Sequence, residues 1–278
     1  MDGLIATAAI WVWHFANSNF VTAFAGAAAG AYSAQWIVEQ REVRRITIQQ
    51  IRAVNAAIMV AFGMVNTFCA VKRQHIRPLK EAFDAQQSAL EVYLKKKELG
   101  QLAVGEQYEF EADFQLLDFP ACPIDLLQTL LFERVSVTGR PLSLVTTIAQ
   151  ATQSLQRVME LRNNIIADCK ANPRAQTALA QLYFGLKSKD GRTDLSYPSS
   201  VNAILAYTDD CIWFTKRLID DLVEHGKALT KSIKRNPPKI SAPEFTRAIE
   251  LKLIPDDVNY ASWLSAFKST HPTMRDLL

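Results

Sequence analysis

Residues 20–38 read FVTAFAGAAAGAYSAQWIV, a run of 19 residues without an acidic or basic side chain. A helix of this length is about 28 Å long, close to the thickness of the hydrocarbon layer of a bilayer. Over residues 3–38 the only readily ionisable side chain is His14, whereas soluble helices carry frequent charges on the face that meets water. Ser18 or Asn19 can cap the start of the helix. The stretch therefore predicts a transmembrane helix over residues 20–38, within a membrane anchor of residues 1–38.

The charges on either side of this helix predict its orientation. Arg41, Arg44, Arg45 and Arg52 follow it, whereas the preceding flank offers only Asp2 and the terminal amine. Because basic residues stay on the cytoplasmic side, the bulk of the chain is expected in the cytoplasm, below an inner (cytoplasmic) membrane. A cleaved signal peptide is the alternative, but the segment has no basic region at its start and the helical pattern continues past it.

The segment before the span, Leu4–Phe15, is apolar and contains Trp11, Trp13 and His14. Indole rings suit the headgroup boundary, so this segment is expected to lie flat on the outer surface. Alternatively, a break at residues 17–19 turns a short two-helix hairpin through the bilayer, which would place both chain ends inside.

One face of the predicted span consists of small residues, and Gly26 and Gly30 form a GxxxG pair within it. Helices with such a face can approach backbone to backbone and gain dispersion contacts, so the anchors are expected to self-associate into a homo-oligomer. The alternative is that Ala and Gly only keep the segment weakly hydrophobic. The residues of this face are Ala23, Gly26, Ala27, Gly30, Ala31 and Ala34.

A second uncharged run covers residues 53–71 and is also long enough to cross a bilayer. Basic residues flank it on both sides, so a single crossing of the bilayer would place one of the two basic clusters on the outer side of the membrane. We therefore interpret it as a buried helix of a cytoplasmic bundle rather than a span. Asn55 and Asn66 share a face with Met59 and Phe62, so both asparagines are expected to be buried in a packed interface. If the run does span, a pore becomes the alternative.

The basic residues around both apolar runs are expected to lie close to the membrane and to contact anionic lipid. They are Arg41, Arg44, Arg45, Arg52, Lys72, Arg73 and Arg77.

The rest of the chain predicts an all-α fold with long antiparallel helices. Long helices or a helical hairpin are expected over residues 39–104, a connector with room for one short strand over 105–123, and a helical bundle over 124–278. Within the bundle, two long helices carry apolar seams at alternating three- and four-residue steps, and such helices pack together at a shallow angle. The seams are Leu144, Ile148, Leu155, Val158, Ile165 and Cys169, and Tyr207, Cys211, Phe214, Leu218, Leu222 and Leu229.

Motifs for chemistry are absent from the sequence. It contains no phosphate-binding glycine loop, zinc-protease motif or serine-nucleophile motif, and its four histidines and four cysteines are scattered. The 31 basic and 28 acidic residues are too balanced for nucleic acid to be the main partner. The sequence therefore predicts a protein without enzymatic activity, metal or cofactor.

Two polar features stand out on the long helices. Arg162 falls in an apolar seam and needs an acidic partner, for which the pairs Asp209–Asp210 and Asp220–Asp221 are candidates. We interpret Arg162 as a residue that fixes the register of the bundle rather than a ligand site. The acidic pairs are interpreted as a solvated, salt-bridged face rather than a cation site, because Lys216 and Arg217 lie between them.

Three short motifs carry a resemblance: Asn17-Ser-Asn-Phe before the Ala/Gly-rich run, Asn55-Ala-Ala-Ile, and Asn66 ahead of Lys72-Arg-Gln-His. Over the first 80 residues or so the chain resembles a loosely defined group of uncharacterised bacterial N-terminally membrane-anchored helical proteins. The resemblance implies a bacterial inner-membrane setting and no catalytic motif. By analogy alone, some proteins of this design are effectors in phage defence.

Two functions are therefore weighed. The first is a non-enzymatic membrane-anchored scaffold or partner-binding module that acts through a protein partner. The second is a membrane-disrupting or pore-forming effector held in check by a partner. They differ in whether residues 53–71 cross the bilayer.

Overall fold

The computed structural model describes residues 19–188 and 190–267, and this part of the chain is helical, as the sequence predicts. Its helices are α2 (Asn19–Val71), η1 (Lys72–Ile76), α3 (Arg77–Glu98), α4 (Ile124–Thr129), η2 (Leu130–Arg134), α5 (Arg140–Ala171), α6 (Gln176–Phe184), α7 (Ser196–Lys231), α8 (Thr246–Glu250), η3 (Asp257–Tyr260) and α9 (Ala261–Ser265). The described residues contain no β-strand, only one isolated bridge between Lys187 and Thr193. The predicted interfacial segment at residues 4–15 lies outside the described residues.

One continuous helix runs through α2, η1 and α3, from residue 19 to residue 98, and is about 120 Å long at 1.5 Å per residue. Pro78 does not break it, because a π-helical turn precedes the proline and places it in the first turn of α3, where no backbone N–H is needed. The chain turns back only at Gly100, whose φ of 67° lies in the left-handed region that glycine adopts easily. Of the two alternatives expected for residues 39–104, the structure thus has the long helix and not the hairpin.

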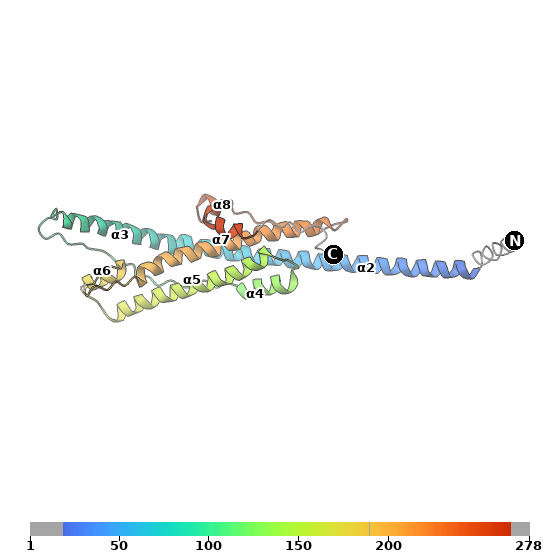
Figure 1. Cartoon of the computed structure of the whole chain (residues 1–278), viewed down its shortest axis with the longest axis horizontal. Coiled ribbons are helices and arrows are strands. Elements are labelled where there is room, and N and C mark those ends of the chain that lie inside the picture. Colours follow the sequence, from blue (N-terminus) through green and yellow to red (C-terminus); the bar gives the residue numbers. More distant parts are fainter. Residues whose placement is uncertain (1–18, 189, 268–278) are drawn as a thin grey trace, which may run out of the picture.

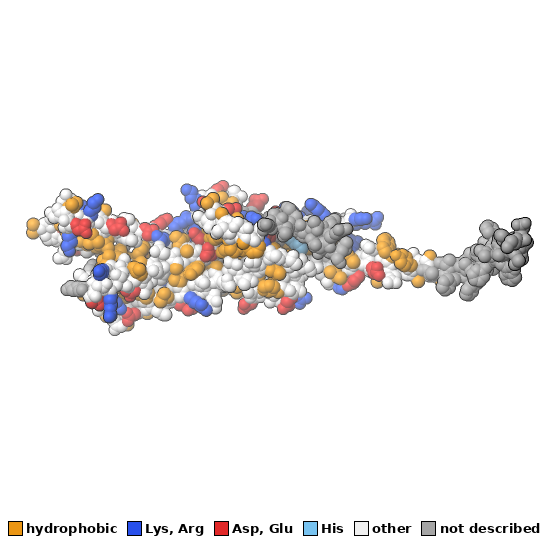
Figure 2. Space-filling view, viewed as in Figure 1, with side chains coloured by type: hydrophobic (Ala, Val, Ile, Leu, Met, Phe, Trp, Pro, Cys, Tyr) orange, Lys and Arg blue, Asp and Glu red, His pale blue; other side chains and the backbone are white. Residues whose placement is uncertain are grey.

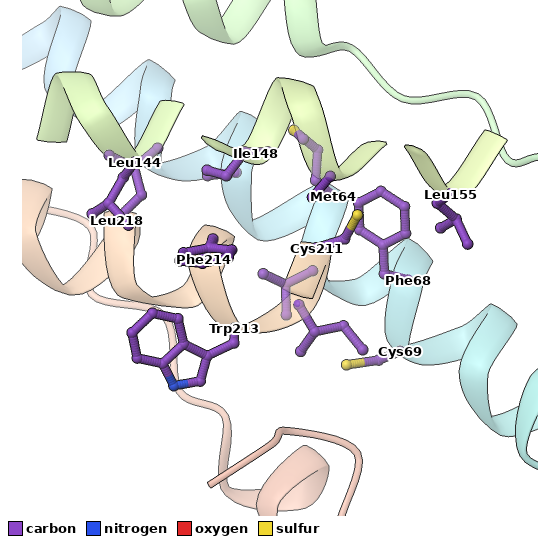
Figure 3. Close-up of a cluster of buried hydrophobic side chains, with 14 of the residues drawn as sticks. Met64, Phe68, Cys69, Leu144, Ile148, Leu155, Cys211, Trp213, Phe214 and Leu218 are labelled. Atoms are coloured by element: carbon purple, nitrogen blue, oxygen red, sulfur yellow. The ribbon is translucent and has the colours of Figure 1, made fainter. Parts of the chain in front are cut away.

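Helices α5 and α7 pack antiparallel to each other, and α7 also packs along α2 (Figure 1). Three pairs of side chains set the register between α5 and α7: Arg140 with Asp221, Thr152 with Cys211, and Arg162 with Tyr197. The core lies between these three helices, and Figure 3 shows how Met64 and Phe68 meet residues of both predicted seams there.

The second apolar run forms the α2 wall of this core. Seven of its residues, at helical spacing, are 0–1% exposed: Val54, Ala57, Ile58, Ala61, Met64, Val65 and Phe68. The asparagine face points elsewhere, since Asn66 is exposed, Met59 is 52% exposed and Asn55 is only half-buried. The expectation that both asparagines are buried is therefore wrong. The larger aliphatic side chains at three- and four-residue steps form the stronger apolar stripe and take the core position.

The connector over residues 105–123 forms no strand. Its alternating aromatic residues instead pack on α6, where Phe110 lies against Tyr183 and Phe184 and Tyr108 stacks on Phe110. An extended segment lying on a helix buries every second side chain, so the pattern that suggests a strand also fits this arrangement.

Beyond the bundle, the N-terminal part of α2 continues as a projecting helix (Figure 1). We call residues 19–40 the stalk. Within the described residues one helix, Ala29–Glu98, is long and apolar enough by length and composition to cross a membrane. Of its most apolar 18 residues 44% are buried, and because the buried positions of this helix begin at Ile51, this part is the second apolar run and not the stalk.

Candidate functional site

The stalk is an apolar helix that nothing in the described chain covers. Its described side chains are all exposed, and no described atom lies within 4 Å of the position that a Cβ would take on Gly26 or Gly30, apart from the helix itself. The small-residue face predicted to self-associate is therefore open in the described part of the chain. The exposed members of this face are Ala23, Gly26, Ala27, Gly30, Ala31 and Ala34.

Two exposed aromatic residues lie at the bundle end of the apolar run. Tyr32 is 75% exposed and Trp36 is 56% exposed, and they are four residues apart on one side of the helix. Aromatic side chains with a polar tip gather at the interface between lipid and water. The sequence interpretation overlooked both residues, although their position just before the first charges was the available signal.

The first group of predicted lipid-facing residues follows directly on the same helix. Arg41, Arg44, Arg45 and Arg52 are exposed. Arg45 forms a bidentate ion pair with Glu42, and this guanidinium lowers the pKa of the Glu42 carboxyl.

The second group lies elsewhere, which corrects the prediction of a single lipid-facing cluster. Lys72 is 28 residues beyond Arg44 on one continuous helix, so about 40 Å separates them. Arg73 is exposed, but Lys72 is only 6% exposed, and both Lys72 and Arg77 bind the chain itself. The basic residues before and after the second apolar run look equivalent in the sequence, but they lie at different positions along the length of the molecule.

Lys72 and Arg77 hold a C-terminal segment, residues 236–267, which we call the strap. Lys72 Nζ donates to the Leu253 carbonyl at 2.9 Å and lies 2.5 Å from Asp209 Oδ1. Arg77 donates to the Leu251 carbonyl at 3.1 Å and to the Lys252 carbonyl at 2.5 Å. Burial raises the pKa of Asp209, and the neighbouring Lys72 opposes this rise.

Asn55 binds the backbone of the same strap. Its amide nitrogen donates to the Lys239 carbonyl at 2.9 Å, and its amide oxygen accepts from the N–H of Ser241 at 2.9 Å. Further along the chain, Tyr260 of the strap stacks on Trp213 of α7, and the two ring centroids are 4.1 Å apart. Trp263 of the strap also docks on α7, since its ring centroid lies 5.1 Å from that of Phe214.

Replacing Asn55 with alanine removes both hydrogen bonds and is expected to lower the free energy of unfolding by about 1–2 kcal/mol. Amide hydrogen exchange over residues 238–242 should accelerate together with the loss of stability. Asn66→Ala is the matched control, because Asn66 is exposed on the same helix, and its effect should stay within about 0.5 kcal/mol. Equal effects of the two substitutions would contradict the role given to Asn55.

Arg162 is fully buried, as the sequence predicts, but its predicted acidic partner is wrong. It donates to the carbonyls of Gln115 at 2.7 Å and Asp113 at 3.0 Å, and to the Tyr197 hydroxyl at 3.4 Å. Its neighbour Asn163 exchanges two hydrogen bonds with the backbone of Leu117. The connector is thus fixed to α5 in the same way as the strap is fixed to α2.

The four aspartates of α7 have separate partners. Asp209 pairs with Lys72, Asp210 accepts from the Tyr260 hydroxyl, Asp220 pairs with Lys216, and Asp221 with Arg140. The antiparallel register explains why none meets Arg162, which lies opposite the start of α7. Among the described residues, no group of three or more His, Cys, Asp or Glu could hold a metal ion.

The cysteines and a cavity beside α6 add no further candidate site. Cys69, Cys122, Cys169 and Cys211 are free thiols. Burial raises the pKa of the Cys69 and Cys122 thiols to about 11, so they stay protonated and unreactive near neutral pH. A cavity of about 690 Å³ lies between α6 and the start of α7, and none of the residues predicted as sites lines it.

No known protein family, curated protein or solved structure matches this chain. The function is therefore argued from the geometry of the stalk and the bundle alone.

Proposed function

We propose that this protein is a single-pass membrane protein in which residues 20–38 cross the bilayer and carry a non-enzymatic helical scaffold or partner-binding module. The observation that supports the proposal is the division of α2 into two apolar parts with opposite surroundings. Residues 53–71 bury one face in the core with α5 and α7, whereas the apolar stalk is exposed along its described length. A large exposed apolar surface favours a bilayer or another protein over water.

The burial of one face of residues 53–71 in the bundle core argues against the pore-forming alternative. A pore requires residues 53–71 to leave the bundle, which would expose the α2 wall of the core and separate Phe68 from α5 and α7. The energetic cost of exposing several fully buried aliphatic and aromatic side chains is several kcal/mol. We therefore favour a stable bundle outside the bilayer over an effector that inserts this helix.

Orientation and assembly complete the proposal. The arginines after the stalk favour a bundle on the cytoplasmic side of a bacterial inner membrane. The exposed face with Gly26 and Gly30 is suited to pairing with a second copy of the anchor, which would bring two bundles side by side and present a common surface to a protein partner.

Two paired-arginine variants of the full chain test the proposal. Gly26→Arg with Ala29→Arg places two charges near the middle of the proposed span, at a cost of about 2.5–3.5 kcal/mol each. After expression in bacteria, the wild type is expected to remain in the membrane pellet in alkaline carbonate, and this variant to be released from it.

The matched control is Met59→Arg with Gly63→Arg, because both residues are exposed on the surface of the second apolar run. This variant is expected to stay in the membrane pellet and to keep its folded bundle. Release of the control instead would show that residues 53–71 are the membrane-spanning segment. Release of the wild type by carbonate would contradict a transmembrane anchor.

A further inference from the structure

The positive charge of this protein is concentrated at one end of the bundle. Residues 39–52 and 227–239 together hold nine of the 31 basic residues and two of the 28 acidic ones. These two segments therefore carry +7, while the rest of the chain carries −4. The net charge of +3 conceals this asymmetry.

The second of these segments is the C-terminal end of α7 and the residues that follow it, which contain no acidic residue. An Arg44 guanidinium nitrogen donates to the Arg235 carbonyl at 3.1 Å, and this bond places the end of α7 beside α2 just below the stalk. In Figure 2, basic side chains are visible along the end of α7, beside α2. Five basic residues of this segment are exposed: Lys227, Lys231, Lys234, Arg235 and Lys239.

The level of this contact fits the headgroup layer of the proposed bilayer. Arg44 lies six residues beyond Val38, which corresponds to about 9 Å along the helix. The headgroup layer extends about 5–8 Å beyond the hydrocarbon on each side, and long basic side chains reach several ångströms further. Arg41, Arg44, Lys234 and Arg235 can therefore reach lipid phosphates at the same time.

We infer that these residues form a collar through which the end of the bundle docks on anionic lipid headgroups. The collar consists of Arg41, Arg44, Lys231, Lys234 and Arg235, and it combines two segments that are almost 200 positions apart in the sequence. Arg45 contributes less because Glu42 neutralises it. The inference rests on the proposed anchor, which brings the collar to the membrane.

Docking gives the anchor a second contact with the membrane. Each basic residue near an anionic surface strengthens binding about fivefold, and salt weakens this attraction. The bundle is then held against the bilayer at low ionic strength and released from it when the surface charge is screened or removed.

Limited trypsin digestion of the full chain in nanodiscs tests the collar. Discs of phosphatidylcholine alone are compared with discs that contain about 30% phosphatidylglycerol, whose surface is anionic. Cleavage after Arg235 is measured relative to cleavage after Arg192, which is exposed in a loop at the other end of the bundle. We expect this ratio to fall at least tenfold in the anionic discs and to recover at high salt.

Two triple variants of equal charge sharpen the test. Arg41→Gln with Lys231→Gln and Lys234→Gln leaves the Arg235 cleavage site in place and should abolish the protection by anionic lipid. Lys95→Gln with Lys96→Gln and Lys97→Gln removes three exposed charges from the end of α3 and should preserve it. An unchanged ratio between the two lipids in the wild type, or protection that survives in the first variant, would overturn the collar.

Co-elution with the discs reports on the anchor separately. Co-elution with both lipids supports the anchor whatever the cleavage ratio. Co-elution with anionic discs alone would support the collar and overturn the anchor, and co-elution with neither would overturn both.

Discussion

Phe68→Ala is expected to lower the free energy of unfolding of the bundle by about 3–5 kcal/mol. Phe68 is fully buried in the middle of the second apolar run and packs between α2, α5 and α7 (Figure 3). Its truncation removes apolar contacts and leaves a cavity that a three-helix core can close only in part. Urea unfolding of the full chain in mild detergent, followed by tryptophan fluorescence, measures the change through the buried Trp213.

Met59→Ala is the matched control for Phe68→Ala. Met59 lies on the same run but is 52% exposed, so its truncation should cost less than about 1 kcal/mol. The contrast between the two substitutions depends on the burial pattern of the bundle. A helix surrounded by lipid would not follow this pattern, so equal effects of the two substitutions would contradict the placement of residues 53–71 in a bundle core.

Arg162→Leu is expected to have the second large effect, a loss of about 2–5 kcal/mol. The substitution removes two hydrogen bonds from the guanidinium, to the carbonyls of Asp113 and Gln115, and only the Asp113 carbonyl keeps a second donor, the Tyr197 hydroxyl. Each lost hydrogen bond to a charged group costs about 1.5–3 kcal/mol. Because these carbonyls belong to the connector, amide exchange over residues 105–123 should accelerate more than exchange in α2. Urea titration and residue-resolved hydrogen exchange measure the two effects.

Two comparisons separate the hydrogen bonds of Arg162 from its charge. Arg157→Leu removes an exposed arginine from the same helix, and its effect should stay within about 0.5 kcal/mol. Arg162→Lys keeps the charge but loses the planar fork that reaches two carbonyls, so an intermediate stability is expected. If Arg162→Leu is as stable as the wild type, the connector does not depend on this residue.

Arg162 and Asn55 illustrate why polar partners were harder to predict than apolar seams. Both are polar residues in otherwise apolar surroundings, and the sequence shows them as such. Their actual partners are backbone groups of irregular segments. A backbone carbonyl is the same at every position, so no residue type in the sequence marks it as a partner. The aspartates of α7 are the acids that the sequence offers to Arg162, but they are bound elsewhere.

The basic residues illustrate the same limit for surfaces. Arg44 and Lys72 both flank the second apolar run and look equivalent in the sequence. They are about 40 Å apart because the helix continues unbroken between them. The backbone of Arg235, 191 positions away, lies beside Arg44 instead. Only the packing of α7 on α2 brings these charges to one level.

The helical class, the approximate position of the long helices, the apolar seams of α5 and α7 and the uncharged run of residues 20–38 can all be read from the amino-acid sequence. Each follows from periodicity and composition within one segment, which are local properties of the chain. The packing of the helices in three dimensions makes residues 53–71 a core wall, and it sets which side chains hold the connector and the strap and which charges gather below the stalk. These depend on the register between helices far apart in the sequence, and hydrophobic periodicity does not specify which residue lies opposite which.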